Sequence, residues 1–366
     1  MTMKFPDNVI WRPMPGSQEA FLASSPIFEV LFEGTRGGGK SIADDTLVLT
    51  DEGWIRADDV TMSHRLVAGD GSYVRLLGIY PQPKKQMYEI TFAGGQKIVA
   101  SGDHRWKVRN TSRGWQVRTT DEIRKTLSSG WSIPYMSGPH GGVPWAGPDP
   151  YILGLIAGDG TIHYERNNIT IYSVDKPILD YLHEAGWKIA FNRAGLNLKD
   201  SEEILQWIRK SDKICPTILE ADADARLAYL QGLMDSDGSA YRRASFCNNL
   251  AHLAANLCNS LGGRATVSLK KYSGDREKYY YQVAIADQNK FVPFRLTRKL
   301  QPQKKCLYRN IESIKPTDSV SHRCFAVDHP DHTFVIEGYI VTHNTDTLLM
   351  SFAMHVNRGY GSAWKG

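Results

Sequence analysis

The sequence predicts a mainly β fold built from two separate segments, interrupted by an α+β insertion and flanked at both ends by short α/β fragments. Three observations support this prediction. A glycine-rich phosphate loop that starts at Gly34 lacks the helix that should follow it, and a suitable helix begins only at Thr345. Residues 42–54 alternate between apolar and polar like a strand. Two apolar helices of similar sequence end in Asp-Gly, at Asp159 and at Asp237.

The composition is that of a globular protein. The chain has 366 residues, of which 42% are hydrophobic and 23% charged, and this length favours about two or three domains. Residues 1–8 are polar and the apolar run 28–32 is too short to span a membrane, so we expect a cytoplasmic protein without a signal peptide. The five cysteines form no C-x-x-C pair. We therefore expect free thiols rather than disulfides or a zinc site.

Positive charge is concentrated in one stretch. Residues 263–305 contain eleven Lys or Arg and three Asp or Glu, a net charge of +8, while the whole chain has +5. Tyrosines are interleaved with these cations. A basic stretch rich in aromatic residues suits a nucleic-acid surface, although an ordinary solvated basic face has the same composition.

The phosphate loop is divided between the two ends of the chain. Residues 28–33 predict a buried strand, and Gly34, Gly39 and Lys40 complete the pattern G-x-x-x-x-G-K. Ser41 could serve as the hydroxyl residue that holds magnesium, which would leave an intact ATP site. However, a helix must follow this loop, and the residues after Ser41 predict strands.

The missing helix is predicted over residues 345–355, so joining Lys40 to Thr345 restores strand, loop, Lys, Thr and helix in order. The joined segment, with the upstream stretch 11–18, resembles the ATPase domain of phage terminase large subunits. In that family the glutamine, here Gln18, is associated with the adenine. The resemblance implies that fragments 1–40 and 345–366 bind ATP and Mg²⁺ only once joined, through Gly34, Gly39, Lys40 and Thr345.

The residues around Thr345 indicate self-cleavage. The side-chain amide of Asn344 can attack its own carbonyl and form a succinimide. His343 can polarise that carbonyl or protonate the leaving group. Thr345 supplies a hydroxyl that can accept an acyl group.

Two internal stretches match this ending. Residues 98–106 match the pattern T-x-x-H, with Ser101 at the threonine position and His104 as the histidine. Residues 324–334 end in His332 followed by Thr-Phe. With the His-Asn-Thr ending, these motifs resemble those of inteins, which excise themselves from a host protein. The resemblance implies a mainly β, horseshoe-like Hint splicing domain formed by residues 41–140 and 305–344. In this domain, His104 would activate the peptide bond after Lys40, and His332 would be the assisting histidine of the second motif.

Trp106, Cys324 and Thr342 resemble the Trp-Cys-Thr signature of class 3 inteins. In that class the internal cysteine attacks the upstream junction directly, which suits a thiol better than the hydroxyl of Ser41. Cys324 would take the acyl group from Lys40 and pass it to Thr345, and Asn344 would then cyclise, without metal or nucleotide. The alternative is a conventional intein initiated by Ser41, with Cys324 merely structural.

The segment between the two splicing pieces, residues 145–300, follows a Gly/Pro-rich boundary at 138–148. Residues 152–160 and 230–238 both resemble the LAGLIDADG helix of homing endonucleases. In this family Gly154 and Gly232 would let the helices pack closely. Each repeat continues as strands and then a helix, at 161–172 and 176–185 in the first and at 240–246 and 250–261 in the second.

The resemblance implies that Asp159 and Asp237 hold Mg²⁺ and hydrolyse both strands of DNA. The target would be the intein-free version of the same terminase gene, with the basic stretch contacting phosphates. Lys270 or Lys271 is our suggestion for an assisting basic residue. A degenerate insertion that only binds DNA is the alternative.

Overall fold

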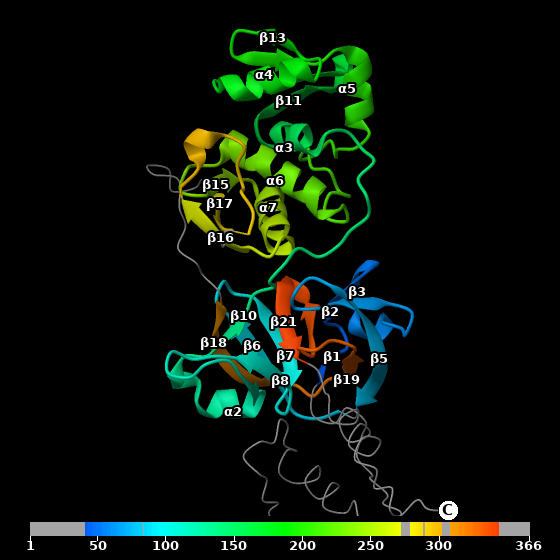
Figure 1. Cartoon of the computed structure of the whole chain (residues 1–366), viewed down its shortest axis with the longest axis vertical. Coiled ribbons are helices and arrows are strands. Elements are labelled where there is room, and N and C mark those ends of the chain that lie inside the picture. Colours follow the sequence, from blue (N-terminus) through cyan, green and yellow to red (C-terminus); the bar gives the residue numbers. More distant parts are fainter. Residues whose placement is uncertain (1–40, 83, 272–278, 288–289, 302–307, 344–366) are drawn as a thin grey trace, which may run out of the picture.

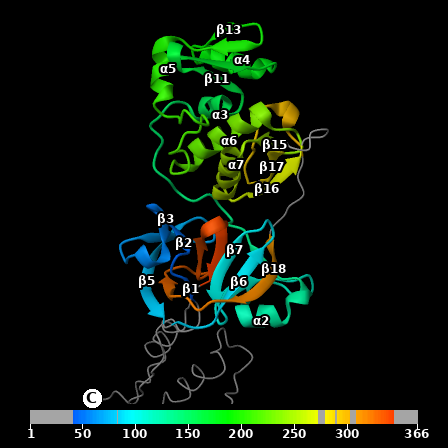
Figure 2. The same cartoon turned by 180° about the vertical axis from the view of Figure 1, so that it is seen from behind.

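The computed structural model describes residues 41–343, except 83, 272–278, 288–289 and 302–307. Two units follow one another along the long axis of the molecule (Figure 1; Figure 2 from behind). One combines residues 42–134 with 308–343, and the other contains residues 150–299. The two predicted host fragments lie outside the described residues, and so do the predicted site residues Gly34, Gly39, Lys40, Asn344 and Thr345.

The first unit is mainly β, which confirms that part of the predicted fold. Its large sheet has the order β10-β18-β6-β7-β1-β19-β5-β4-β2-β20-β21, and β3 pairs with β2. The strands are β1 (Ile42–Ala43), β2 (Leu47–Thr50), β3 (Gly53–Arg56), β4 (Arg65–Val67), β5 (Tyr73–Gln82), β6 (Met87–Phe92), β7 (Lys97–Ser101), β10 (Ser132–Pro134), β18 (Tyr308–Thr317), β19 (His322–Val327), β20 (Thr333–Ile336) and β21 (Ile340–His343).

Alternating burial explains why these residues form strands. Along β5, Val74 and Leu76 are buried, whereas Arg75 and Leu77 are exposed. The buried side chains join a core drawn from both sequence segments, since Ile98 packs in the same cluster as Phe334. A separate hairpin of β8 (Arg105–Val108) and β9 (Gln116–Thr119) leads into α2 (Thr120–Lys125), which begins with a capping box between Thr119 and Glu122.

The second unit mixes helices and strands in two related halves. Its sheets have the orders β11-β12-β14-β13 and β15-β17-β16. The first half contains α3 (Pro150–Asp159), β11 (Gly160–His163), β12 (Asn168–Tyr172), α4 (Lys176–Glu184), β13 (Lys188–Ala190), β14 (Arg193–Gly195) and α5 (Leu198–Leu205). The second contains α6 (Ala223–Asp237), β15 (Arg243–Phe246), α7 (Asn248–Ser260), β16 (Arg264–Lys271) and β17 (Tyr279–Ala286). The order of strands and then helix agrees with the sequence prediction, whereas β13, β14 and α5 were not anticipated.

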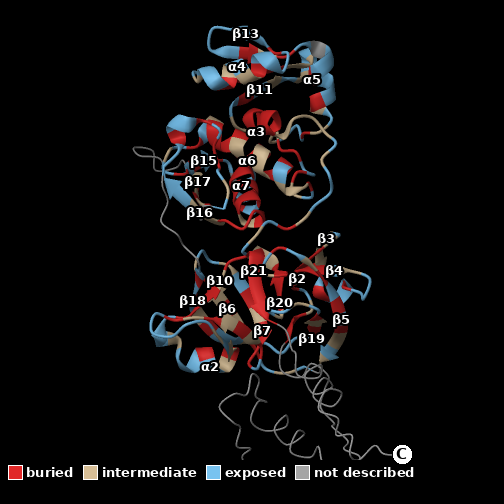
Figure 3. Cartoon of the chain, viewed as in Figure 1, coloured by how far each residue is buried: buried red, intermediate tan, exposed pale blue. Residues whose placement is uncertain are grey.

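Helices α3 and α6 cross at two glycines. A Cβ added to Gly154 would overlap the carbonyl oxygen of Tyr229, and one added to Gly232 would overlap that of Tyr151. Only residues without a side chain allow the two backbones to approach this closely. The crossing lies at the centre of the unit, where α3 is almost wholly buried (Figure 3). It brings the C-terminal ends of both helices together.

The two units contact each other through buried polar groups. Arg226 of α6 donates to the imidazole Nε2 of His140 and to the carbonyl oxygen of Ser260. His140 stacks on Tyr339, which directly precedes β21. Burial and the charge of Arg226 lower the pKa of His140 to about 4, so this imidazole is neutral near pH 7. In the part of the chain that is described, no helix is long and apolar enough to cross a membrane.

Candidate functional site

The first candidate site forms where β1 lies between β7 and β19. Ile42 pairs with Arg323 and Ala43 with His322, so the antiparallel register places Ser41 opposite Cys324. The Ser41 Oγ and Cys324 Sγ atoms are 3.1 Å apart although 283 positions separate the residues. Both side chains are buried, with exposed fractions of 0% and 1%. The first residue after Lys40 therefore carries a hydroxyl group and has the thiol of Cys324 beside it.

The turn between β7 and β8 approaches the two predicted splice junctions. At one side, the Ser41 N–H donates to the Ser101 Oγ at 3.4 Å. At the other, the His104 Nε2 lies 2.6 Å from the Thr342 Oγ1, two residues before Asn344. His104 and Thr342 are both buried. Two residues of one turn, Ser101 and His104, thus contact residues near both ends of segment 41–344.

Trp106 fixes the imidazole of His104 from a second direction. The ring centroids of the two residues are 4.6 Å apart, with an interplanar angle of 64°. The Trp106 Nε1–H donates to the Thr120 Oγ1 at 3.0 Å, and that hydroxyl donates to the His104 carbonyl oxygen. Because Trp106 and Thr342 contact the same imidazole, two of the three predicted signature residues act on His104. The third, Cys324, contacts Ser41.

The remaining histidines meet at the end of β21. Thr333 pairs with His343 in the β20–β21 hairpin, and the ring centroids of His332 and His343 are 6.1 Å apart. His332 has a left-handed backbone with φ of 50°, which is uncommon for a residue other than glycine. The seven described residues predicted for splicing thus form three contacting groups: Ser41 with Cys324, His104 with Trp106 and Thr342, and His332 with His343.

The second candidate site lies where α3 and α6 end. Asp159 and Asp237 are the last residues of the two helices, and both are exposed to solvent. Although each residue keeps an exposed face, partial burial of its carboxyl group raises the pKa of Asp237 to about 6, with a further contribution from the negative charge of Asp159. Burial also raises the pKa of Asp159. The two carboxylates are thus close enough to repel each other.

Two lysines that the sequence analysis missed face this acid pair. The Lys213 Nζ donates to the carbonyl oxygens of Gly158 and Gly160 at the end of α3. The Lys299 Nζ donates to the carbonyl oxygens at positions 234 and 235, near the end of α6. Burial lowers the pKa of both ammonium groups, while the nearby carboxylates oppose that shift. Each helix end thus receives one acid and one lysine.

A pocket opens beside these groups. Among the residues that line it are Gly158, Lys213, Asp237 and Cys247, together with Tyr279 and its two successors on β17. Lys270 and Lys271, suggested from the sequence, lie on the exposed end of β16 and are not among its described lining residues. Lys271 instead lies over the ring of Tyr279.

The residues at the helix ends fit a hard divalent cation. Oxygen ligands from carboxylates and backbone carbonyls are those that Mg²⁺ prefers. A cation between Asp159 and Asp237 would also relieve the repulsion from Asp159 that contributes to the raised pKa of Asp237. The described residues contain no cluster of three or more His, Cys, Asp or Glu side chains, so water or phosphate oxygens would have to complete the coordination.

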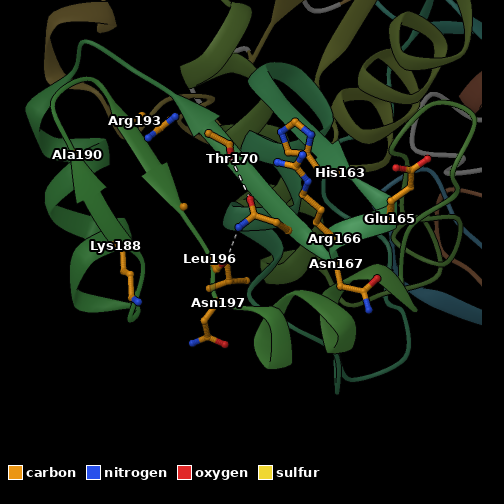
Figure 4. A pocket seen from close by; sticks show the side chains of 12 residues that line it. His163, Glu165, Arg166, Asn167, Thr170, Lys188, Ala190, Arg193, Leu196 and Asn197 are labelled. Atoms are coloured by element: carbon orange, nitrogen blue, oxygen red, sulfur yellow. Dashed lines mark hydrogen bonds between the residues drawn. The ribbon is translucent and has the colours of Figure 1, made fainter.

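A basic groove runs along the sheet of the first half (Figure 4). Its lining includes Arg166, Lys188 and Arg193, with Glu165 as the acid among them. Asn168 donates to the carbonyl oxygen of Leu196 and accepts from Thr170, so the groove floor is tied together. On the second half, Arg264, Lys270 and Lys271 lie on β16. Both sheets therefore present cations.

Comparisons with known proteins give partial matches. No family model matches the chain. A replicative DNA helicase DnaB of Mycobacterium intracellulare is 25% identical over 370 residues, which cover 88% of this chain and 62% of the relative. A replicative DNA helicase DnaB of Mycobacterium leprae is 35% identical over 89 residues, 24% of this chain and 14% of the relative. The chain thus spans less than two thirds of the curated relatives that it matches.

Several solved structures of inteins also match. A gp41-1 intein variant shares 10% identity, covers 84% of this chain and 100% of its own, and has a TM-score of 0.30. The Msm DnaB1 intein splicing domain bound with zinc shares 12%, with coverages of 83% and 99% and a TM-score of 0.28. A variant of the Ssp DnaB mini-intein shares 11%, with coverages of 86% and 99% and a TM-score of 0.33.

Proposed function

We propose that this chain is a self-splicing precursor that excises residues 41–344 and joins Lys40 to Thr345. The observation that carries the proposal is the 3.1 Å contact between Ser41 and Cys324, which brings a buried thiol to the residue after Lys40. The contact between His104 and Thr342 supports the same conclusion from the other junction. The two contacts link positions 283 and 238 residues apart, as a reaction that joins two distant junctions requires.

In the proposed first step the Cys324 thiolate attacks the carbonyl carbon of Lys40. The Lys40–Ser41 peptide bond breaks, the Ser41 nitrogen leaves as an amine, and the acyl group is held as a thioester on Cys324. The hydrogen bond from the Ser41 N–H to the Ser101 hydroxyl holds the scissile amide in place. His104, oriented by Trp106 and Thr342, acts on that peptide bond.

The later steps use the groups at the end of β21. The Thr345 hydroxyl takes the acyl group from Cys324, which regains its thiol. The Asn344 side-chain nitrogen then attacks the Asn344 carbonyl, releasing Thr345 and leaving a succinimide. His343, with His332 beside it, assists this cyclisation. The ester on Thr345 finally rearranges to an amide without further catalysis.

Mass spectrometry of the purified chain tests the proposal. The expected products are residues 41–344 with a C-terminal succinimide or Asn, and a ligated host fragment that reads Lys40–Thr345. Asn344→Ala should leave the second junction intact. An unprocessed chain of unchanged mass under all conditions would contradict splicing.

We further propose that residues 145–300 are a DNA endonuclease of the LAGLIDADG type. The close crossing of α3 and α6 at Gly154 and Gly232 supports this, because it pairs Asp159 with Asp237. These acids would hold Mg²⁺, which supplies an activated water and stabilises the leaving oxygen. Lys213 and Lys299 would stabilise negative charge on the cleaved phosphates. The basic groove and β16 would contact the DNA backbone.

For the host protein we propose a phosphate-loop ATPase restored by splicing, in which Gly34, Gly39, Lys40 and Thr345 bind ATP and Mg²⁺. The sequence resemblance favours a phage terminase large subunit working in the cytoplasm. The two curated relatives are described as replicative DNA helicases, which makes a helicase the second candidate. Assaying the ligated host protein for DNA packaging or DNA unwinding distinguishes the two.

A further inference from the structure

His322, the first residue of β19, has a buried ring nitrogen, Nε2, to which the proposed splicing steps assign no role. Its side chain is 1% exposed, and its Nδ1 lies 2.9 Å from the carbonyl oxygen of Val320. Its Nε2 is buried and has no hydrogen-bond partner among the described residues. The buried His140 differs, since its Nδ1 contacts the Gly141 carbonyl and its Nε2 accepts from Arg226. An unsatisfied buried nitrogen costs stability, so its presence calls for a role.

The strand geometry places His322 beside the proposed nucleophile. His322 and Cys324 are two residues apart on β19, so their side chains share one face, about 6.6 Å apart along the strand. On the neighbouring β1, Ala43 pairs with His322, and Ser41 follows opposite Cys324. The side chain of Ala43 is a single methyl group. No bulky residue of β1 therefore separates the imidazole from the Ser41–Cys324 contact.

The hydrogen bond to the Val320 carbonyl oxygen determines which ring nitrogen of His322 carries the hydrogen. A carbonyl oxygen can only accept, so Nδ1 must carry the hydrogen. In the neutral imidazole, Nε2 then has a lone pair and is the basic atom. His322 thus presents a buried base on the strand face that carries the thiol.

We propose that His322 is the proton acceptor for the Cys324 thiol, acting directly or through one water molecule. This inference rests on the proposed splicing function. The Nε2 takes the proton from Sγ, and the thiolate attacks the Lys40 carbonyl carbon. As the Lys40–Ser41 bond breaks, the proton passes from the imidazolium to the departing Ser41 nitrogen. The step consumes no external acid, base or cofactor.

The charged groups on the surrounding strands are already paired. Arg323, which follows His322 on the opposite face, binds Asp44 beyond β1. Asp103 after β7 binds Lys85 after β5. The other titratable or polar groups opposite this face are Tyr80 and Gln82 on β5, Ser41 on β1 and Ser101 on β7. His322 is thus the imidazole closest in sequence and register to the thiol.

The test measures the first step alone. In a Thr345→Ala background the thioester cannot move on, so cleavage by added thiol reports its formation. With His322 intact, the thiol has its own proton acceptor, so the rate should rise little as the pH is raised above 7. His322→Gln should lower the rate at pH 7 by about 10²-fold or more. In His322→Gln the thiol must lose its proton to hydroxide or buffer, so the rate should keep rising with pH and the difference between the two chains should narrow.

Two controls separate chemistry from structure. His140→Gln replaces another buried histidine, whose ring contacts Gly141, Arg226 and Tyr339, and should leave the pH profile of the first step unchanged. Cleavage at Asn344 should proceed normally in His322→Gln if the fold is intact. A uniform loss of rate at every pH, or no loss at all, would overturn the role of His322. Splicing by Cys324→Ala would instead overturn the proposed thiol route itself.

Discussion

The two proposed sites are built in opposite ways. Around β1 the reacting groups are side chains sealed from solvent, with Ser41 and His104 at 0% and Cys324 at 1% exposure. At the ends of α3 and α6, the reacting groups are charged and open, since Asp159 and Asp237 are both exposed. A reaction on the chain's own backbone needs no entry path for substrate. A reaction on DNA needs an open surface that carries charge.

The difference also shows in how each site is held. The splicing site depends on hydrogen bonds between distant strands, such as His104 to Thr342, so each residue is fixed by several neighbours. The acid site depends on one helix crossing at Gly154 and Gly232. We therefore expect substitution of one reacting side chain to abolish splicing. DNA cleavage should be lost on substitution of the carboxylates and also on substitution of the distant glycines at the helix crossing.

The largest expected effect is at the splicing site. Cys324→Ala should abolish thioester formation, because it removes the nucleophile and leaves the Lys40 carbonyl without an attacking group. Ser41→Ala should still splice, since the proposed route uses only the backbone nitrogen of Ser41. Gel and mass analysis of precursor and ligated product measure both. The reverse pattern, with Ser41→Ala inactive and Cys324→Ala active, would identify a conventional Ser41-initiated intein.

The second prediction tests whether the two sites are independent. Asp159→Asn or Asp237→Asn should reduce Mg²⁺-dependent DNA cleavage by about 10²-fold or more, because each removes a charged metal ligand. Splicing should proceed at the rate of the unmodified chain. Lys213→Met should also impair cleavage, whereas Lys176→Met, on the exposed surface of α4 and outside the described lining of both the pocket and the basic groove, serves as a matched control. The substrate is duplex DNA that spans the joined codons of Lys40 and Thr345.

Undiminished cleavage by Asp159→Asn together with Asp237→Asn would remove the helix ends from the mechanism. DNA binding without cleavage by the unmodified chain would favour the degenerate insertion that the sequence leaves open. Slower splicing in either variant would show that the two sites are coupled. The buried contact of Arg226, His140 and Tyr339 would be the first place to look for such coupling.

The third prediction concerns the helix crossing. Gly154→Ala should destabilise the insertion by about 1–3 kcal/mol, because the added methyl group would overlap the Tyr229 carbonyl. Gly195→Ala on β14 is the matched control, since its Cβ would meet no atom within 4 Å. Thermal unfolding of both variants makes the comparison. Equal stability of the two would show that α3 and α6 can separate without cost.

Sequence reasoning reached the parts of this architecture that are local or periodic. The alternation of residues 42–54, which form β1, β2 and the start of β3, and the paired Asp-Gly helix ends are visible in the sequence itself. Lys213 was missed because it lies in a loop with a left-handed φ of 60°, where no periodic pattern applies. His322 was missed because its importance depends on its place beside β1, a pairing between residues about 280 positions apart. Local motifs name reacting groups, whereas the groups that tune them come from tertiary contacts.

The smallest expected effect is on the pH dependence of stability. Because the pKa of Asp237 is raised to about 6 from 3.8, the folded chain holds the proton more tightly than the unfolded chain. Ionisation of Asp237 therefore lowers stability as the pH rises from about 4 to about 6, and the loss is complete above that range. Asp237→Asn cannot ionise and should unfold at a temperature a few degrees higher at pH 7.5, with little difference at pH 4.

The comparison uses a Cys324→Ala background, in which all chains remain precursors, and buffers without divalent cations. Added Mg²⁺ should then stabilise the chain that retains Asp237 more than the Asn variant, because binding to the folded state alone shifts the equilibrium. A lower unfolding temperature for Asp237→Asn at pH 7.5 would mean that the attraction of Lys213 outweighs burial and the repulsion from Asp159.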